Sequence, residues 1–184
     1  MQYATIEDVE EYGGFTNPTE AERAMLDTLI SAASKMIDDE CNRVFGVPPD
    51  AVTVAKTFTA DNGLLPGTGL LPDSGRTLYL DDDLYDVVSI PTLPVGTTLT
   101  YLPDHPPYYA LVRSEGAWED PTTIVGNWAY SNTPPVSIVN ETCRLTCALH
   151  FQRQGQNAGE NRSPFGPPHP DKRILSHYRR IKLP

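Results

Sequence analysis

The strongest constraint on the fold of this chain is a junction between an expected strand, 122–130, and an expected helix, 136–154. β-Branched and aromatic residues alternate around Gly126, as in a strand that has a bulge or closely approaches another backbone. Pro134 and Pro135 then end the strand and set up the first helical turn, because proline cannot donate to a sheet. Such a junction fixes one helix at the edge of a small β unit.

Length and composition predict one domain, or one domain with appendages, around a modest core. The chain has 184 residues, of which 39% are hydrophobic, and its 18 prolines and 13 glycines predict many turns and extended segments. Neither a bilayer-spanning apolar run nor a charged-then-apolar leader after Met1 is present, so we expect a soluble protein made in the cytosol. Three cysteines without a framework spacing are expected to be reduced thiols.

Charge is distributed unevenly along the chain. The net charge is −10, but residues 150–184 contain seven Lys or Arg and two acidic residues, which leaves −15 on the remainder. The acidic body argues against nucleic-acid binding over the whole surface. The basic end predicts either contact with an acidic partner surface or a disordered, solubilising tail.

Helix signals and strand signals occupy separate regions, which predicts an α+β fold. Thr5 is expected to cap a helix over 5–12, and a long helix over 18–45 is expected to begin near Pro18 with Thr16 or Asn17 as its cap. Its apolar residues recur every three or four positions, so two long helices with short ones should form a bundle.

The region 52–130 is expected to form a small antiparallel β module inserted into this bundle. Short runs of β-forming residues alternate with Gly, Pro and Asp clusters, a spacing that favours a small barrel or sandwich. Together, residues 1–154 make the predicted main domain. The expected strands are 52–59, 76–80, 87–90, 98–102, 108–113 and 122–130.

Residues 155–184 are expected to form a linker and a docking arm. The segment 155–170 is polar and rich in Gly, Asn and Pro, whereas 171–182 has one apolar stripe and basic residues at the end of an expected short helix. A helix of this length is marginal alone in water, so we expect it to be stabilised on another chain. The predicted docking residues are Ile174, Leu175, Tyr178, Arg179 and Arg180.

The segment 63–73 combines the Gly and Pro content of a loop with four leucines. Leucines exposed on a loop have a function only when a partner covers them, which favours a contact loop. The alternative, a loop folded onto its own core, stays open. The leucines in question are Leu64, Leu65, Leu70 and Leu71.

Cysteine and histidine side chains offer one candidate metal site. Cys143, Cys147 and His150 share a helical face, and Cys41 lies on the other long helix, so four ligands could in principle hold zinc in a zinc-dependent binding module. The spacing lacks the two-residue knuckle of structural zinc sites, and free cysteine is often simply buried. We therefore predict core packing and no metal.

Candidate catalytic groups are few. Asp81, Asp82, Asp83 and Asp86 lack the alternation and the glycine of a calcium loop, so we expect an acidic turn; a carboxylate-based hydrolase is the alternative. No serine lies in a Gly-x-Ser-x-Gly context, and the Gly-rich segment 67–69 does not continue into a phosphate-binding loop. We predict neither enzymatic activity nor a cofactor.

Several segments resemble the head-to-tail connector (adaptor) proteins of tailed bacteriophages. The sharpest similarity is the Gly-Asn-Trp-Ala-Tyr run at 126–130 followed by prolines, and weaker ones lie at 3–9, 33–45 and 78–90. Ala129 stands where a second glycine is common, and the linker 155–170 is longer than the family leads us to expect. The residues that carry the motif are Gly126, Trp128, Tyr130 and Pro134.

The resemblance implies a structural virion protein in the neck, at the head–tail interface. Copies would form a homo-oligomeric ring, expected to be a dodecamer, that binds the portal protein, continues the DNA channel and serves as a platform for a stopper or tail-completion protein. DNA would pass without specific binding, since acidic side chains facing the channel repel phosphates, and no membrane is involved. The alternative at the same junction is a stopper or tail-completion protein, a class dominated by β structure.

Overall fold

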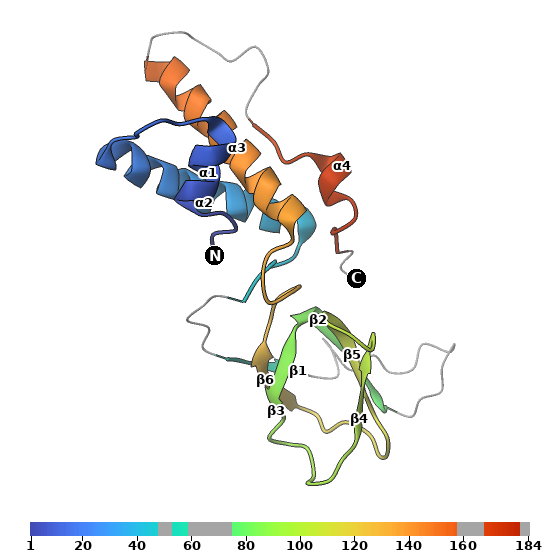
Figure 1. Cartoon of the computed structure of the whole chain (residues 1–184). Helices are drawn as coiled ribbons and strands as arrows, with labels where there is room; N and C mark the ends of the chain where they lie inside the picture. Colours follow the sequence, from blue (N-terminus) through green and yellow to red (C-terminus); the bar gives the residue numbers. More distant parts are fainter. Residues whose placement is uncertain (48–52, 59–74, 158–167, 181–184) are drawn as a thin grey trace. The chain divides into compact units, whose positions relative to one another are not determined.

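The computed structural model describes residues 1–47, 53–58, 75–157 and 168–180 (Figure 1). The chain divides into two compact units. A helical unit consists of Met1–Phe45 and Pro134–Pro184, and a β unit, Gly46–Thr133, is inserted in the chain between its second and third helices. The expected α+β mixture is confirmed. In the part that the structure describes, no helix is long and apolar enough to cross a membrane.

The first two helices begin at capping boxes. Helix α1, Ile6–Gly13, is capped by Thr5 as predicted and ends at Gly14 in the left-handed conformation. Helix α2, Glu20–Cys41, is capped by Thr19 and ends at Asn42, which has φ of 52°.

The expected bounds 18–45 for the second helix are wrong at both ends. The hydroxyl of Thr19 accepts from the backbone N–H of Glu22, whose carboxylate bonds back to Thr19, so the helix begins after Thr19 and not at Pro18. Phe45 fits the apolar spacing of the helix but lies beyond its end. It is apolar because it belongs to the core, where it is fully buried and its ring contacts Tyr3 edge-to-face at 5.8 Å.

Helix α3 spans Val136–Asn157, three residues beyond the expected end. The carbonyl of Pro135 accepts from the N–H groups of Ile138 and Val139 at 2.9 and 3.1 Å, so the prolines lead directly into the first turn as predicted. Helix α4, Lys172–Leu175, is a single turn capped by Asp171. The expected helix over 171–182 is wrong, because the chain turns after Leu175 and makes long-range bonds instead of continuing helical ones.

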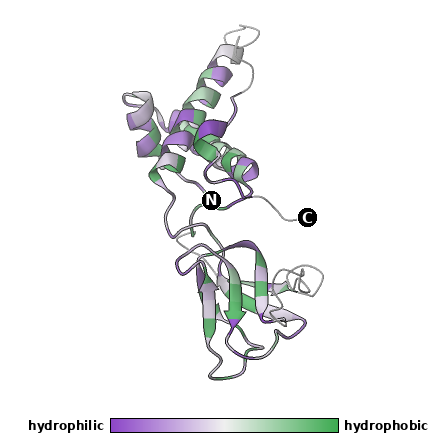
Figure 2. Ribbon diagram, turned by 90° about the vertical axis from the view of Figure 1, so that its right-hand side faces the viewer, coloured by the Kyte–Doolittle hydropathy of each residue, from purple (hydrophilic) through white to green (hydrophobic). Residues whose placement is uncertain are grey.

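The three longer helices pack around a shared core. Helix α3 contacts both α1 and α2, and α2 also contacts α4. Hydrophobic and hydrophilic residues both occur along these helices, as expected for helices with one buried side (Figure 2). The core cluster consists of Ala4, Val9, Leu26, Ile30, Cys143 and Cys147.

The β unit contains two three-stranded antiparallel sheets with strand orders β1-β6-β3 and β2-β5-β4. Both sheets contribute to one hydrophobic cluster, formed by Phe58, Leu78, Leu80, Leu84, Leu111, Trp118 and Ile124. The strands are β1 Val54–Phe58, β2 Thr77–Leu84, β3 Asp86–Ser89, β4 Leu99–Leu102, β5 Tyr108–Arg113 and β6 Thr122–Asn127.

Each of the six expected strands is present; only 108–113 has both ends as expected, and the largest differences are at the ends of β2 and β6. The acidic run 81–83 lies inside β2 and is not a turn, since β2 continues past an irregularity to pair Leu84 with Tyr108. Within this run Asp83 is buried, and Asp82 forms an ion pair with Lys56 of β1. Strand β6 ends at Asn127 and not at residue 130.

Candidate interaction sites

Gly126 is the position in the motif where backbone space is most restricted. It pairs with Val54 of β1 on one side and Val87 of β3 on the other. A Cβ atom added at Gly126 would lie 2.4 Å from the backbone oxygen of Asp86 and 2.8 Å from Cδ1 of Leu84. The predicted close backbone approach is confirmed, and an irregularity in register lies on the β3 side of the pair.

Trp128 ties the edge strand β1 to the end of β6. Its indole N–H donates to the backbone oxygen of Val54 at 2.9 Å. The Nζ atom of Lys56 lies 4.4 Å from the centre of the indole ring, and the ring of Phe58 lies 5.8 Å away. Tyr130 and Pro134, the remaining motif residues, are half-buried in the segment that leads to α3. Gly126 and Trp128 of the motif therefore stabilise the pairing of β6 with its neighbouring strands.

The C-terminal arm, residues 168–180, packs on a surface of α2 and α3 that we call the arm seat. Leu175 is 1% exposed, and its carbonyl lies 4.0 Å from Sγ of Cys41. The backbone N–H of Arg180 donates to the carbonyl of Cys41 at 2.8 Å. Because the last carbonyls of a helix have no partner within the helix, the arm supplies one for the end of α2.

Aromatic rings connect the arm to the N-terminus of the chain. The hydroxyl of Tyr178 is 2.8 Å from Oγ of Ser137, at the start of α3, and its ring meets Phe45 edge-to-face at 5.5 Å. Phe45 in turn donates its N–H to the hydroxyl of Tyr3 at 2.9 Å, and Tyr3 donates to the carboxylate of Asp38. Burial raises the pKa of Asp38 to about 6.

An ion pair between the buried Glu141 and the part-exposed Arg144 holds the first part of the arm. Glu141 is 1% exposed and receives two hydrogen bonds of 2.8 Å from Arg144. Glu141 also accepts from the backbone N–H of Asp171 at 2.6 Å, and Arg144 donates to the carbonyl of His169 at 2.8 Å. Each charged side chain therefore has a partner of opposite charge and also binds a backbone group of the arm. The hydrogen bond to Glu141 raises the pKa of Arg144.

The five predicted docking residues do not lie on one surface. Leu175 is buried and Tyr178 packs on residues of the same chain, and their stabilisation by another chain stays a prediction. Ile174 and Arg179 are exposed, and Arg180 is half-buried. Docking on the portal stays a prediction. The four leucines of the expected contact loop lie outside the described residues.

The cysteines pack as predicted. Cys143 and Cys147 belong to the helical core, whereas Cys41 is buried at the arm seat, and burial raises the pKa of the Cys41 and Cys143 thiols to about 11. His150 is 3% exposed, with its ring 5.1 Å from Phe15. In the described ranges, no group of three or more His, Cys, Asp or Glu residues could hold a metal ion.

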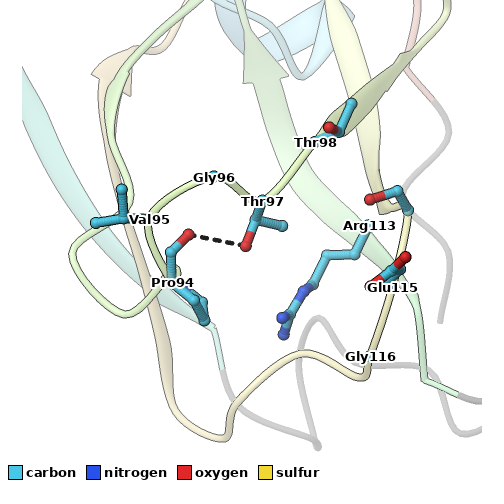
Figure 3. A pocket seen from close by; sticks show the side chains of 9 residues that line it. Pro94, Val95, Gly96, Thr97, Thr98, Arg113, Glu115 and Gly116 are labelled. Atoms are coloured by element: carbon cyan, nitrogen blue, oxygen red, sulfur yellow. Dashed lines mark hydrogen bonds between the residues drawn. The ribbon is translucent and has the colours of Figure 1, made fainter.

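The β unit has an open polar hollow (Figure 3). Arg113 points into it, but this guanidinium also donates to the carbonyl of Ala117 and lies 5.9 Å from the ring of Trp118. The polar side chains that line the hollow are hydroxyls, one arginine and one glutamate. It is lined by Pro94, Val95, Gly96, Thr97, Thr98, Arg113, Ser114, Glu115 and Gly116.

Comparison with solved structures finds a similar fold. The chain is similar to a chain of the solved structure "Neck of empty GTA particle computed with C6 symmetry", with a TM-score of 0.56, 11% sequence identity, and coverage of 99% of this chain and 92% of that chain. At this identity the similarity shows the fold. No protein-family model matches the sequence, and no curated protein matches it.

Proposed function

We propose that this protein is a structural component of the neck of a tailed-phage-like particle, in a ring between portal and tail. The observation that carries the proposal is a fold shared over 99% of the chain with a component of a particle neck. The Gly126, Trp128 and Tyr130 motif resembles phage connectors by an independent criterion, because that similarity rests on sequence alone.

The proposed ring contains twelve copies, continues the DNA channel and carries a stopper or tail-completion protein. The C6 symmetry used for the similar neck structure is compatible with rings of six or twelve copies. The acidic body suits a channel wall, since carboxylates facing the lumen would let DNA slide past. The role is structural, without a catalytic reaction or cofactor.

The proposed contact with the portal uses the exposed side of the arm. Ile174 and Arg179 remain on the surface while Leu175 and Tyr178 anchor the arm to its seat. A seated arm therefore presents one apolar side chain, Ile174, and several basic ones, among them Arg173 and Arg179, to a partner. Deleting the whole segment 155–184 would also remove Leu175 from its pocket, so point substitutions give a cleaner test.

Electron microscopy and native mass spectrometry of the full-length protein, alone and with portal-filled heads, test the proposal. We expect rings whose copy number is a multiple of six, seated at the portal vertex. The double variant Ile174→Asp/Arg179→Glu should lose binding to heads at least tenfold. Lys35→Glu, which changes an exposed lysine of α2, should bind normally. A protein that stays monomeric and ignores portal-filled heads would overturn the proposal.

A further inference from the structure

The arm seat is built to recognise a segment of chain, and most of its contacts involve backbone atoms of the arm. Glu141, Arg144 and the carbonyl of Cys41 bind the arm at Asp171, His169 and Arg180 respectively, and each of these arm groups is a backbone N–H or C=O. The side chains of Leu175 and Tyr178 add one apolar anchor and one hydroxyl contact. The arm of an identical copy would make the same set of contacts.

The charge distribution favours a basic segment in this seat. The last turns of α2 contain Asp38, Asp39 and Glu40, and no basic residue lies in its last turn. Carboxylates near the negative end of a helix are unfavourable, and nearby cations offset them. The arm places Arg179 and Arg180 at this end: Arg179 acts electrostatically on Cys41, as Arg43 just after the helix does, and the backbone of Arg180 bonds to Cys41.

The covalent connection to the arm is long enough to reach a neighbour. Arg144, at the seat, and Asn157, at the end of α3, are about 20 Å apart along the helix. Eleven peptide steps join Asn157 to Pro168 and can span at most about 40 Å. A compact unit with the number of residues of the helical unit is about 30 Å wide. A neighbouring copy shifted by that width along α3, toward Asn157, would place its arm seat within the span of the connecting segment.

We propose that in the assembled ring each arm occupies the seat of the adjacent copy. The inference rests on the proposed ring. Exchange keeps every seat contact while it adds a covalent link between subunits, so it gains stability by raising the effective concentration of neighbours. It also supplies the head-to-tail contact that a closed cyclic ring requires, with arm and seat as two different surfaces of one subunit.

A cysteine pair can distinguish arms seated within one chain from arms seated between chains. The N–H of Arg180 lies 2.8 Å from the carbonyl of Cys41, which places the two Cα atoms about 5 Å apart and within disulfide range. The full-length Arg180→Cys variant is assembled into rings, oxidised at alkaline pH because burial raises the pKa of the Cys41 thiol to about 11, and run on a denaturing gel without reductant. We expect covalent multimers from rings and single-chain species from unassembled protein.

Two further variants make every outcome decisive. Arg180→Cys combined with Cys41→Ser should give no multimers, which shows that Cys41 is the partner thiol. Ser176→Cys, next to the Leu175 carbonyl that faces Cys41, should repeat the multimer pattern. Rings with only intrachain disulfides would overturn the exchange and leave the proposed function standing. Rings without disulfides in which a thiol reagent modifies Cys41 readily would mean that the arm has left the seat, which overturns the exchange too. Absence of rings would overturn the proposed function itself.

Discussion

The interiors of the two units differ in how they are held together. The helical unit buries several polar side chains, namely Ser34, Glu141, Thr142, Thr146 and His150. The cluster at the centre of the β unit consists of leucine, isoleucine and aromatic residues. The β unit also buries Asp83 and Thr122, but its two sheets are joined through the apolar cluster.

This contrast predicts different weaknesses. A tightly packed apolar core responds strongly to added or removed volume. Directional polar contacts, such as those of Glu141 with the arm, respond to the loss of one partner or to a change in charge. Both tryptophans, Trp118 and Trp128, lie in the β unit. Tryptophan fluorescence therefore follows that unit, whereas circular dichroism at 222 nm follows the helices.

Gly126→Ala should have the largest effect, confined to the β unit. The added methyl group would clash with the backbone oxygen of Asp86, which cannot move without breaking the pairing of β3 with β6. We expect the free energy of unfolding to fall by about 3 kcal/mol, the upper part of the range for overpacking. Urea unfolding followed by fluorescence measures this loss.

Gly155→Ala is the matched control, because nothing lies within 4 Å of a Cβ atom added at Gly155 of α3. Helix propensity should make that variant more stable, by up to about 1 kcal/mol. An unchanged fluorescence midpoint for Gly126→Ala would show that β3 can shift away, and the rigidity assigned to the β unit would be wrong.

Leu175→Ala should destabilise the helical unit, at the arm seat, without affecting the β unit. Leu175 is 1% exposed, and truncating a buried leucine costs about 2–3 kcal/mol when the site collapses only partly. The dichroism midpoint in urea should fall while the fluorescence midpoint stays constant. The neighbouring Ile174→Ala, at 36% exposure, should cost under about 1 kcal/mol. Equal effects of the two substitutions would contradict the seated arm.

Sequence patterns predicted the local parts of this fold well. The capping residue Thr5 predicted the position of α1, and short runs of β-forming residues predicted all six strands. The restricted space at Gly126 followed from a glycine inside a strand pattern. These features depend on neighbours in sequence, where capping, periodicity and backbone sterics act directly.

Features that depend on distant residues were missed. The spacing of apolar residues extended the second helix to Phe45, although that residue is buried by Tyr3 and Tyr178. The stripe through Leu175 predicted a longer helix, whereas the chain turns after Leu175 and bonds to the end of α2. One signal was available for α2: the Thr19 and Glu22 spacing of a capping box marks its start better than Pro18 does.

The pH dependence of stability that arises from Asp38 is the smallest expected effect, and it should appear in the helical unit alone. Its pKa is about 6 in the folded protein, because burial outweighs the stabilising hydrogen bond from Tyr3, and an unfolded chain would have a pKa near 3.9. Between about pH 4 and 6 the folded state holds a proton that the unfolded state has lost. Raising the pH through this window therefore lowers the free energy of unfolding.

The contribution should be about 1 kcal/mol, since solvent around the half-exposed carboxylate screens part of the effect. In Asp38→Asn the amide keeps a contact for the Tyr3 hydroxyl and does not titrate, so its stability relative to the parent protein should rise by that amount from pH 4 to 7. Lys35 and Asp39, which also influence Asp38, are unchanged and cancel in the difference. Dichroism in urea should show this trend and fluorescence should not. A difference that stays flat with pH would mean that water reaches the carboxylate and that burial does not raise the pKa of Asp38.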